Sequence, residues 1–167
     1  MEYELKELSL NDSKDIYEMI QEIGPGENGF GNSGYHVEYN SFSDYLLKHH
    51  KISNGIDLHS EYVPQTMFWF YVNHRPVGIG KLRHYLNDAL MKKGGHIGYA
   101  IRPSERGKGY GNLILKELLK KAKEIGVEKA LLTVDEKNIY SRRVIENNNG
   151  VLENTVEDSC RYWINLV

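Results

Sequence analysis

The pattern of hydrophobic and polar positions divides the first part of the chain into a strand and two helices. Polar and apolar residues alternate over residues 3–8, which predicts a strand, and apolar residues then recur at helical spacing over 16–23. Asn, Asp and Ser precede that stretch as typical helix caps, and Gly-Pro-Gly at 24–26 ends it. A second helix, behind a capping serine, is predicted to run to about His50.

The rest of the chain alternates β-branched and aromatic stretches with turns. The predicted strands cover residues 66–72, 77–84, 96–102, 130–134, 151–155 and 160–166. An amphipathic helix is predicted over 110–125, with Ile125 on its buried face, and a shorter helix over 141–148. This order of elements predicts an α/β fold in which one mixed sheet is covered by helices, in a single domain over residues 1–167.

Charge and composition narrow the class of protein. The chain carries 21 Lys and Arg against 23 Asp and Glu, a formal charge of −2, so we expect no nucleic acid or anionic membrane as a partner. No apolar run approaches the roughly 20 residues of a membrane span, and the acidic N-terminus is unlike a signal peptide. The single cysteine, Cys160, allows no internal disulfide and fits a reducing compartment. We therefore expect a cytoplasmic protein, with a homodimer left open.

A glycine-rich segment with interspersed aromatic residues extends from Gly24 to about Asn40. It is predicted to be a long ordered loop. Long loops in compact domains often carry function, so this one is either a surface connection or a loop that faces a substrate.

Three glycines at alternate positions, Gly107, Gly109 and Gly111, stand between a predicted strand and the amphipathic helix. A helix N-terminus exposes unpaired N–H groups and a partial positive charge, and glycines let the backbone approach a phosphate closely. Arg106 and Lys108 add positive charge. The segment therefore predicts a phosphate cradle, although a short glycine cluster is also common as a plain strand-to-helix turn.

The pattern around these glycines separates the candidate ligands. The nucleotide P-loop pattern is absent, and the dinucleotide pattern GxGxxG would need a glycine where Asn112 stands. The string IRPSERGKGYG at 101–111 resembles instead the acetyl-CoA motif of the GNAT superfamily of N-acetyltransferases. NIYS at 138–141 resembles the family's Asn-x-x-Ser element, and GGHIGY at 94–99 is similar to a subgroup of bacterial predicted acetyltransferases. The resemblance is specific over about residues 66–155.

This resemblance implies a GNAT-like acyl-CoA N-acyltransferase fold, with acetyl-CoA as donor and no metal. It also implies that backbone N–H groups of the glycine segment bind the pyrophosphate, namely those of Gly107, Lys108, Gly109, Tyr110, Gly111 and Asn112. The strand near Tyr99 to Ile101 is expected to splay from the strand over 130–134 and to leave a gap for the pantetheine arm. An amide near Ile101 would stabilise the oxyanion, while Asn138 and Ser141 would hold the arm.

The groups that would move protons are less directly indicated. GNAT enzymes often carry a carboxylate base on the strand before the glycine turn, and this chain has none there. His96 is the nearest ionisable residue, so it is either the base or a strand histidine without a catalytic role, and Tyr99 is a weaker candidate. The tyrosine that often serves as the acid is replaced by Ile145. Tyr140 is the alternative acid, unless it only packs or the thiolate takes its proton from water.

The function expected from these residues is acetyl transfer from acetyl-CoA to a primary amine of a small molecule. Two alternatives stay open. The acceptor is instead a protein N-terminus or lysine, or the chain is a CoA-binding module without catalysis, as the missing tyrosine at position 145 would allow.

Overall fold

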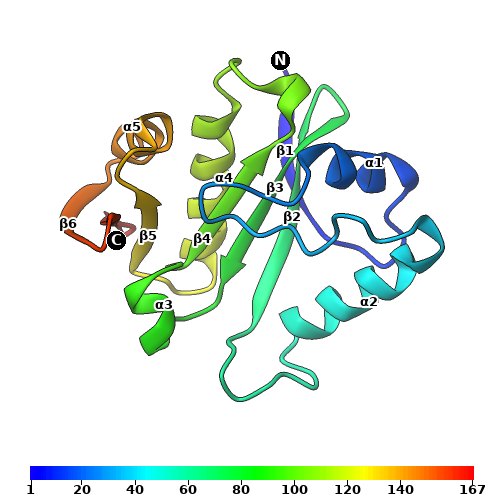
Figure 1. Cartoon of the computed structure of the whole chain (residues 1–167), viewed down its shortest axis with the longest axis horizontal. Coiled ribbons are helices and arrows are strands. Elements are labelled where there is room, and N and C mark those ends of the chain that lie inside the picture. The colour runs from blue at the N-terminus through cyan, green and yellow to red at the C-terminus, as the bar shows by residue number, and fades with distance from the viewer.

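The computed structural model describes residues 1–167 and contains seven strands in two antiparallel sheets flanked by helices (Figure 1). The first sheet has the order β1-β2-β3-β4, from β1 (Tyr3–Glu7), β2 (Gln65–Val72), β3 (Arg75–Arg83) and β4 (Ile97–Ile101). The second has the order β5-β7-β6, from β5 (Lys129–Asp135), β6 (Val151–Val156) and β7 (Ser159–Asn165). The helices are α1 (Lys14–Ile23), α2 (Phe42–Ser53), α3 (Asp88–Lys92), α4 (Tyr110–Glu124) and α5 (Ile139–Asn147).

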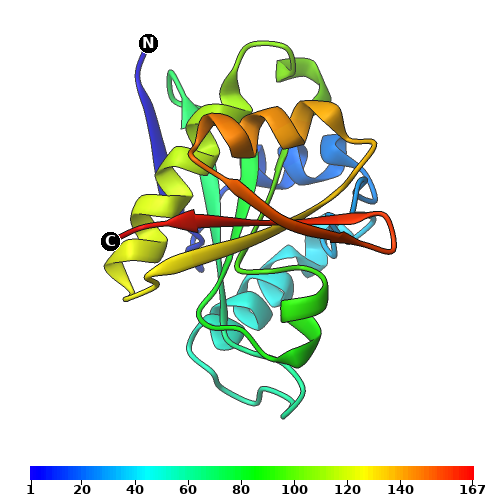
Figure 2. The same ribbon diagram turned by 90° about the vertical axis from the view of Figure 1, so that its left-hand side faces the viewer.

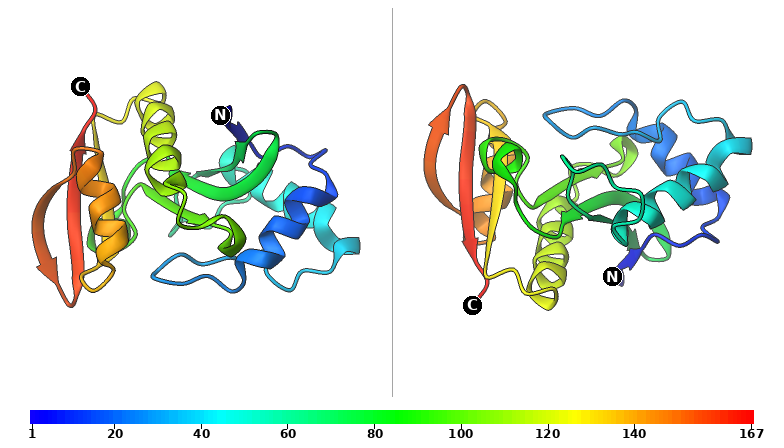
Figure 3. Two further views of the ribbon diagram at one scale, coloured as in Figure 1. Left: turned by 90° about the horizontal axis from the view of Figure 1, so that it is seen from above. Right: turned by 90° about the horizontal axis from the view of Figure 1, so that it is seen from below.

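The predicted fold class is confirmed, but the sheet is divided. Sequence periodicity predicted one mixed sheet, whereas β4 pairs only with β3 and β5 pairs only with β7. Figure 2 shows the second sheet with α5 lying over it, and Figure 3 shows α4 between that sheet and the first one. The division leaves an opening between β4 and β5.

Two hydrophobic cores hold the layers together on opposite faces of the first sheet. On one face α1 and α2 pack over β2 and β3 around the fully buried Trp69, and on the other α4 packs against the strands and α5. Burial of each large apolar side chain contributes about 1.5–3 kcal/mol relative to exposure. The buried face of α1 is the predicted one, Ile16, Met19, Ile20 and Ile23. The prediction for Ile125 was wrong, because α4 ends one residue earlier and this side chain is 48% exposed.

The turns differ in detail from the predicted ones. The β2–β3 turn was predicted over four residues but consists of Asn73 and His74, both with positive φ, so Arg75 and Pro76 already pair with β2. The β6–β7 turn has the same positive φ angles at Glu157 and Asp158, as its predicted position requires. Helix α3 was not predicted. None of the helices has the length and apolarity needed to cross a membrane.

Candidate active site

The strands β4 and β5 meet at one end only. The N–H of His96 donates to the Leu131 carbonyl at 2.7 Å, and the N–H of Leu131 donates to Nδ1 of His96 at 2.9 Å. A Cβ at Gly95 would lie 2.2 Å from the Leu131 carbonyl oxygen, so this close approach requires glycine. Beyond this junction the two strands belong to separate sheets, and a wedge opens between them.

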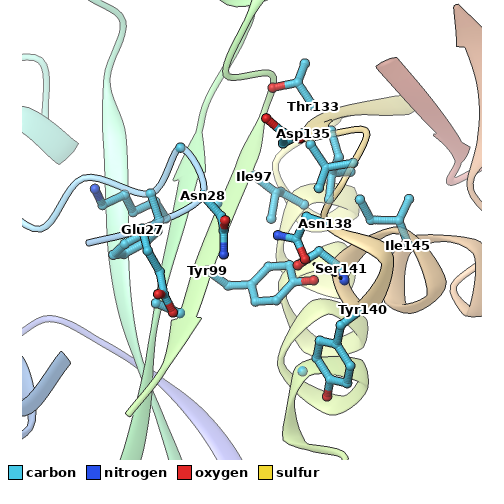
Figure 4. A pocket seen from close by; sticks show the side chains of 18 of the residues that line it. Glu27, Asn28, Ile97, Tyr99, Thr133, Asp135, Asn138, Tyr140, Ser141 and Ile145 are labelled. Atoms are coloured by element: carbon cyan, nitrogen blue, oxygen red, sulfur yellow. Dashed lines mark hydrogen bonds between the residues drawn. The ribbon is translucent and has the colours of Figure 1, made fainter. Parts of the chain in front are cut away.

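A cavity of about 570 Å³ occupies the wedge (Figure 4). Its walls come from β4, β5, the glycine segment, the first turns of α5 and the loop residues 27–31. The predicted site residues that line it are Tyr99, Ile101, Arg106, Gly107, Tyr110, Gly111, Asn138, Tyr140 and Ser141. The predicted residues His96, Lys108, Gly109 and Asn112 do not line it. The fold therefore brings most of the sequence candidates to one place.

The glycine segment ends in an open helix N-terminus. Gly107 and Gly109 have φ of 78° and 81°, and Gly109 is the N-cap of α4, with no side chain capping the helix. None of the six backbone N–H groups over residues 107–112 donates to an acceptor of the protein. A Cβ at Gly107 or Gly109 would meet nothing within 4 Å. These glycines thus leave space beside unpaired donors, an arrangement suited to a phosphate.

The two basic side chains of the segment are tied into the protein. Arg106 donates from Nε to the Ile101 carbonyl at 3.0 Å and pairs with Glu27 at 2.9 Å. Lys108 pairs with Glu105 at 2.7 Å and is exposed. Their charges are thus partly neutralised, whereas the backbone N–H groups of the segment have no acceptor in the protein.

Tyr99 contributes a buried hydroxyl to the wall of the wedge. Tyr99 extends from β4 toward α5, where its hydroxyl faces Ser141 without forming a hydrogen bond (Figure 4). The hydroxyl is buried and has no hydrogen-bond partner in the protein. Burial raises the pKa of Tyr99 and outweighs the lowering effect of the neighbouring Ser141, so the hydroxyl stays protonated at neutral pH. An unpaired buried donor at the wall of a cavity indicates a partner in a bound ligand.

Helix α5 supplies the other side of the wedge. The Asn138 side chain caps the helix by accepting from the Ser141 N–H at 3.2 Å. Tyr140 is 56% exposed and points away from Tyr99 (Figure 4), and its hydroxyl would lie 3.4 Å from a Cβ at Gly111. The hydroxyl of Tyr140 therefore lies at the glycine end of the cavity, where a phosphate is expected.

His96 has a different environment from the one expected for a base. Its Nδ1 lone pair accepts the Leu131 N–H, so the ring proton of the neutral form is on Nε2. The side chain is buried, and burial, followed by the charge of Arg83, lowers the pKa of His96. Neither ring nitrogen then offers a free lone pair, and these contacts favour a structural role at the β4–β5 junction.

Sequence analysis missed several residues that line the cavity. They are Lys81 and Arg83 on β3, Thr133 and Asp135 on β5, and the loop residues Asn28 and Phe30. The glycine-rich composition of the loop was the one available signal, and of its two interpretations the structure supports the one in which it faces the site. Figure 1 shows this loop between α1 and α2 crossing in front of the first sheet.

The comparisons with known proteins agree with this geometry. The family model "Acetyltransferase (GNAT) family" matches residues 33–150. No curated protein matches the chain in sequence.

Several solved structures share the fold at low identity. RimL, the ribosomal L7/L12 α-N-protein acetyltransferase in complex with coenzyme A, is 13% identical with a TM-score of 0.74, covering 98% of this chain and 93% of that one. The Campylobacter jejuni N-acetyltransferase PseH in complex with acetyl coenzyme A is 14% identical with a TM-score of 0.64, covering 98% and 99%. A spermidine N-acetyltransferase SpeG chimera from Vibrio cholerae and hSSAT is 17% identical with a TM-score of 0.66, covering 99% and 96%.

The family model covers more than two thirds of the chain and includes the wedge, the glycine segment and α5. The same segments form a cavity with a row of free backbone N–H groups at one end and a buried tyrosine hydroxyl in its wall. The chain belongs to the GNAT family of acetyltransferases, with acetyl-CoA as the acetyl donor.

Proposed function

We propose that the protein transfers the acetyl group of acetyl-CoA to a primary amine of a small molecule. The observation that carries this proposal is the row of six unpaired N–H groups over residues 107–112, at one end of a cavity that continues between β4 and β5. Phosphate groups fit such a row, and the cavity offers room beyond it for the acyl end of the donor.

The backbone of β4 supports the orientation of the donor. The N–H of Arg102 donates to the Val77 carbonyl of β3 at 2.8 Å. Because the N–H groups of an antiparallel strand alternate in direction, the N–H of Ile101 is directed away from β3, toward the wedge. A donor in this position can stabilise the oxyanion that forms during acyl transfer, and loss of one such donor costs about 10²–10³ in rate.

Tyr99 is the group of this chain that we assign to proton transfer. Acetyl-CoA supplies an activated thioester, and its thiol leaves when an amine attacks. The hydroxyl of Tyr99 is buried, protonated and without a partner in the protein, so it is available to donate to the leaving sulfur. General acid catalysis of this kind contributes about 10²–10⁴ in rate. In this proposal the general acid is Tyr99 and not Tyr140, the acid suggested by the sequence, because the Tyr140 hydroxyl lies at the glycine end of the cavity.

The acceptor end of the cavity favours a small molecule. The loop over 27–31 covers β4, where the ring of Phe30 lies 3.6 Å from the position of a Cβ on Gly98. Lys81 reaches the same loop and donates to the Gly31 carbonyl. The cover narrows access for an extended peptide. A protein N-terminus is the second candidate, because RimL, a structural neighbour, acts on one.

The test combines a binding and a turnover measurement. Thermal shifts with acetyl-CoA, CoA, ATP and NAD identify the donor, since a ligand at 100 times its Kd adds about 2.7 kcal/mol of stability. Thiol release is then measured with a panel of small amines and with peptides that have free N-termini. Turnover of an amine supports the proposal, while turnover of peptides alone replaces it with the protein-directed activity. Tight CoA binding without turnover of either would make the chain a binding module.

A further inference from the structure

Two cations of β3 point into the acceptor end of the cavity without a carboxylate partner. Lys81 and Arg83 are two residues apart, so they share one face of the strand, and both line the cavity. Both side chains are half-buried. Neither forms an ion pair, in contrast to Arg106 and Lys108 at the glycine end.

The contacts of the two cations are made only with neutral groups. The ammonium of Lys81 donates to the Gly31 carbonyl and lies 4.2 Å from the centre of the Phe30 ring. Arg83 donates from Nη1 to the carbonyl of Gly94 at 3.0 Å. Burial, and then the neighbouring charge of Arg83, lowers the pKa of Lys81 to about 8, and burial lowers the pKa of Arg83.

The carboxylates around the cavity belong to other elements. Glu27 is paired with Arg106, and Glu105, which follows β4, is paired with Arg75 and Lys108. Asp135 ends β5, and Glu157 and Asp158 form the β6–β7 turn, so these three lie on the side of the second sheet and in no ion pair. The unpaired carboxylates of the cavity thus lie on the β5 side, and its half-buried, unpaired cations lie on β3. This separation of charge suits a ligand that carries both an anion and an amine.

The phosphates of the donor do not account for the two cations. Lys81 and Arg83 pair with Gly98 and His96 at the beginning of β4, whereas the glycine segment follows the end of that strand. At about 3.3 Å per residue, Gly98 and His96 lie about 10 Å and about 16 Å from Ile101 at the end of β4, and the glycine segment lies beyond that end. Donor phosphates at the free N–H groups leave Lys81 and Arg83 for the other substrate.

We propose that the acceptor is an amine that also carries an anionic group, a carboxylate or a phosphate, and that Lys81 and Arg83 bind this group. The physical reason is that desolvated cations without a counter-ion are unfavourable, and a bound anion makes short charge-assisted hydrogen bonds with them. The inference rests on the proposed transferase function and assigns its substrate class. It disfavours polyamines such as spermidine, which would add positive charge beside two cations.

The experiment uses amines that differ only in the anion. The pairs are β-alanine with propylamine and O-phosphoethanolamine with ethanolamine, and spermidine is the cationic probe. Thiol release gives kcat/KM for each, and calorimetric titration in the presence of CoA gives Kd for the anionic probes. In at least one pair, we expect kcat/KM of the anionic amine to exceed that of its neutral counterpart by about 10- to 100-fold, which is the effect of one or two charged hydrogen bonds. The first pair reports on a carboxylate and the second on a phosphate.

Lys81→Met tests the assignment to this residue, and Lys123→Met, at an exposed position of α4 away from the cavity, is the matched control. Lys81→Met should remove most of the preference for the anionic member while the thermal shift with acetyl-CoA stays unchanged. The control should keep the preference. At position 83 the variant is Arg83→Lys, which retains a positive charge and is therefore expected to fold where Arg83→Met does not. It should weaken the preference for the anionic amine only partly.

The outcomes separate this inference from the proposed function. Failure of every anionic probe to bind, equal kcat/KM within both pairs, or a preference for spermidine would overturn the inference, even if amines are acetylated. A preference that persists in Lys81→Met would also overturn it. Binding of an anionic probe that depends on Lys81, without turnover of any amine, would support the anion site at Lys81 and Arg83 but overturn the transferase function, and with it the assignment of the ligand as an acceptor.

Discussion

The buried hydroxyl of Tyr99 leads to a prediction in which stability and activity change in opposite directions. In Tyr99→Phe the ring keeps its place between β4 and α5, and only the unpaired hydroxyl is lost. A buried polar group without a partner costs about 1–3 kcal/mol of folding free energy, so its removal should stabilise the protein by about 2 kcal/mol. For a chain of this length, that raises Tm by about 4–8 °C.

Activity should fall in the same variant. If the hydroxyl donates to the leaving thiol, turnover decreases by about 10²–10⁴, while the affinity for acetyl-CoA is nearly unchanged. Differential scanning calorimetry and thiol release on the same preparation measure both effects. Tyr140→Phe is the control, because its exposed hydroxyl should change stability by no more than about 0.5 kcal/mol.

Two results would refute this reasoning. A Tyr99→Phe variant that melts at a lower temperature than the wild type would mean that the hydroxyl is hydrogen-bonded in the free protein. Full turnover in Tyr99→Phe, together with a large loss in Tyr140→Phe, would assign the proton donor to α5 instead of β4.

Three further predictions concern the wedge and its support. Gly95→Ala should destabilise the protein by several kcal/mol in urea unfolding, because its Cβ would lie 2.2 Å from the Leu131 carbonyl oxygen. An unchanged unfolding midpoint would contradict the close approach of residue 95 to Leu131. His96→Ala should cost about 1–3 kcal/mol by unpairing the Leu131 N–H, and the wild-type pH–rate profile should show no inflection near 6.5, since the pKa of His96 is lowered; an inflection there that disappears in His96→Ala would restore the histidine as base. Burial raises the pKa of Glu22, but hydrogen bonds from Arg102 and from residue 104 outweigh this effect and lower the pKa from 4.5 to about 2. The stability that this carboxylate contributes is therefore full above pH 4.5 and is lost as the pH falls toward 2. Glu22→Gln should make the unfolding midpoint less dependent on pH in that window, whereas an unchanged pH dependence would argue against the ion pair.

The sequence by itself determined every strand and every helix except α3, and it predicted the glycine segment as one end of the site. Helical spacing fixed the buried face of α1, and most predicted strands lie within a residue or two of the observed ones. The glycine segment was identified because its chemistry depends on local properties, namely positive φ at Gly107 and Gly109 and the unpaired donors of a helix N-terminus. Such properties are encoded by a few neighbouring residues, so a pattern of eleven letters was sufficient.

Tertiary structure decided the rest of the site. Periodicity shows that β4 and β5 are strands but not whether they pair. The gap between them was expected from the family resemblance alone, and the close approach of Gly95 to Leu131 that closes one end of it appears only in the structure. The environment of His96 was decided in the same way, since the N–H that occupies its ring nitrogen lies 35 positions away. Lys81 and Arg83 resemble surface cations in the sequence, and only the packing of the 27–31 loop over β4 turns them into a charged wall of the cavity. The physical reason is that burial, pairing and pKa depend on which distant groups come within a few ångströms, and local residue patterns do not specify those distances.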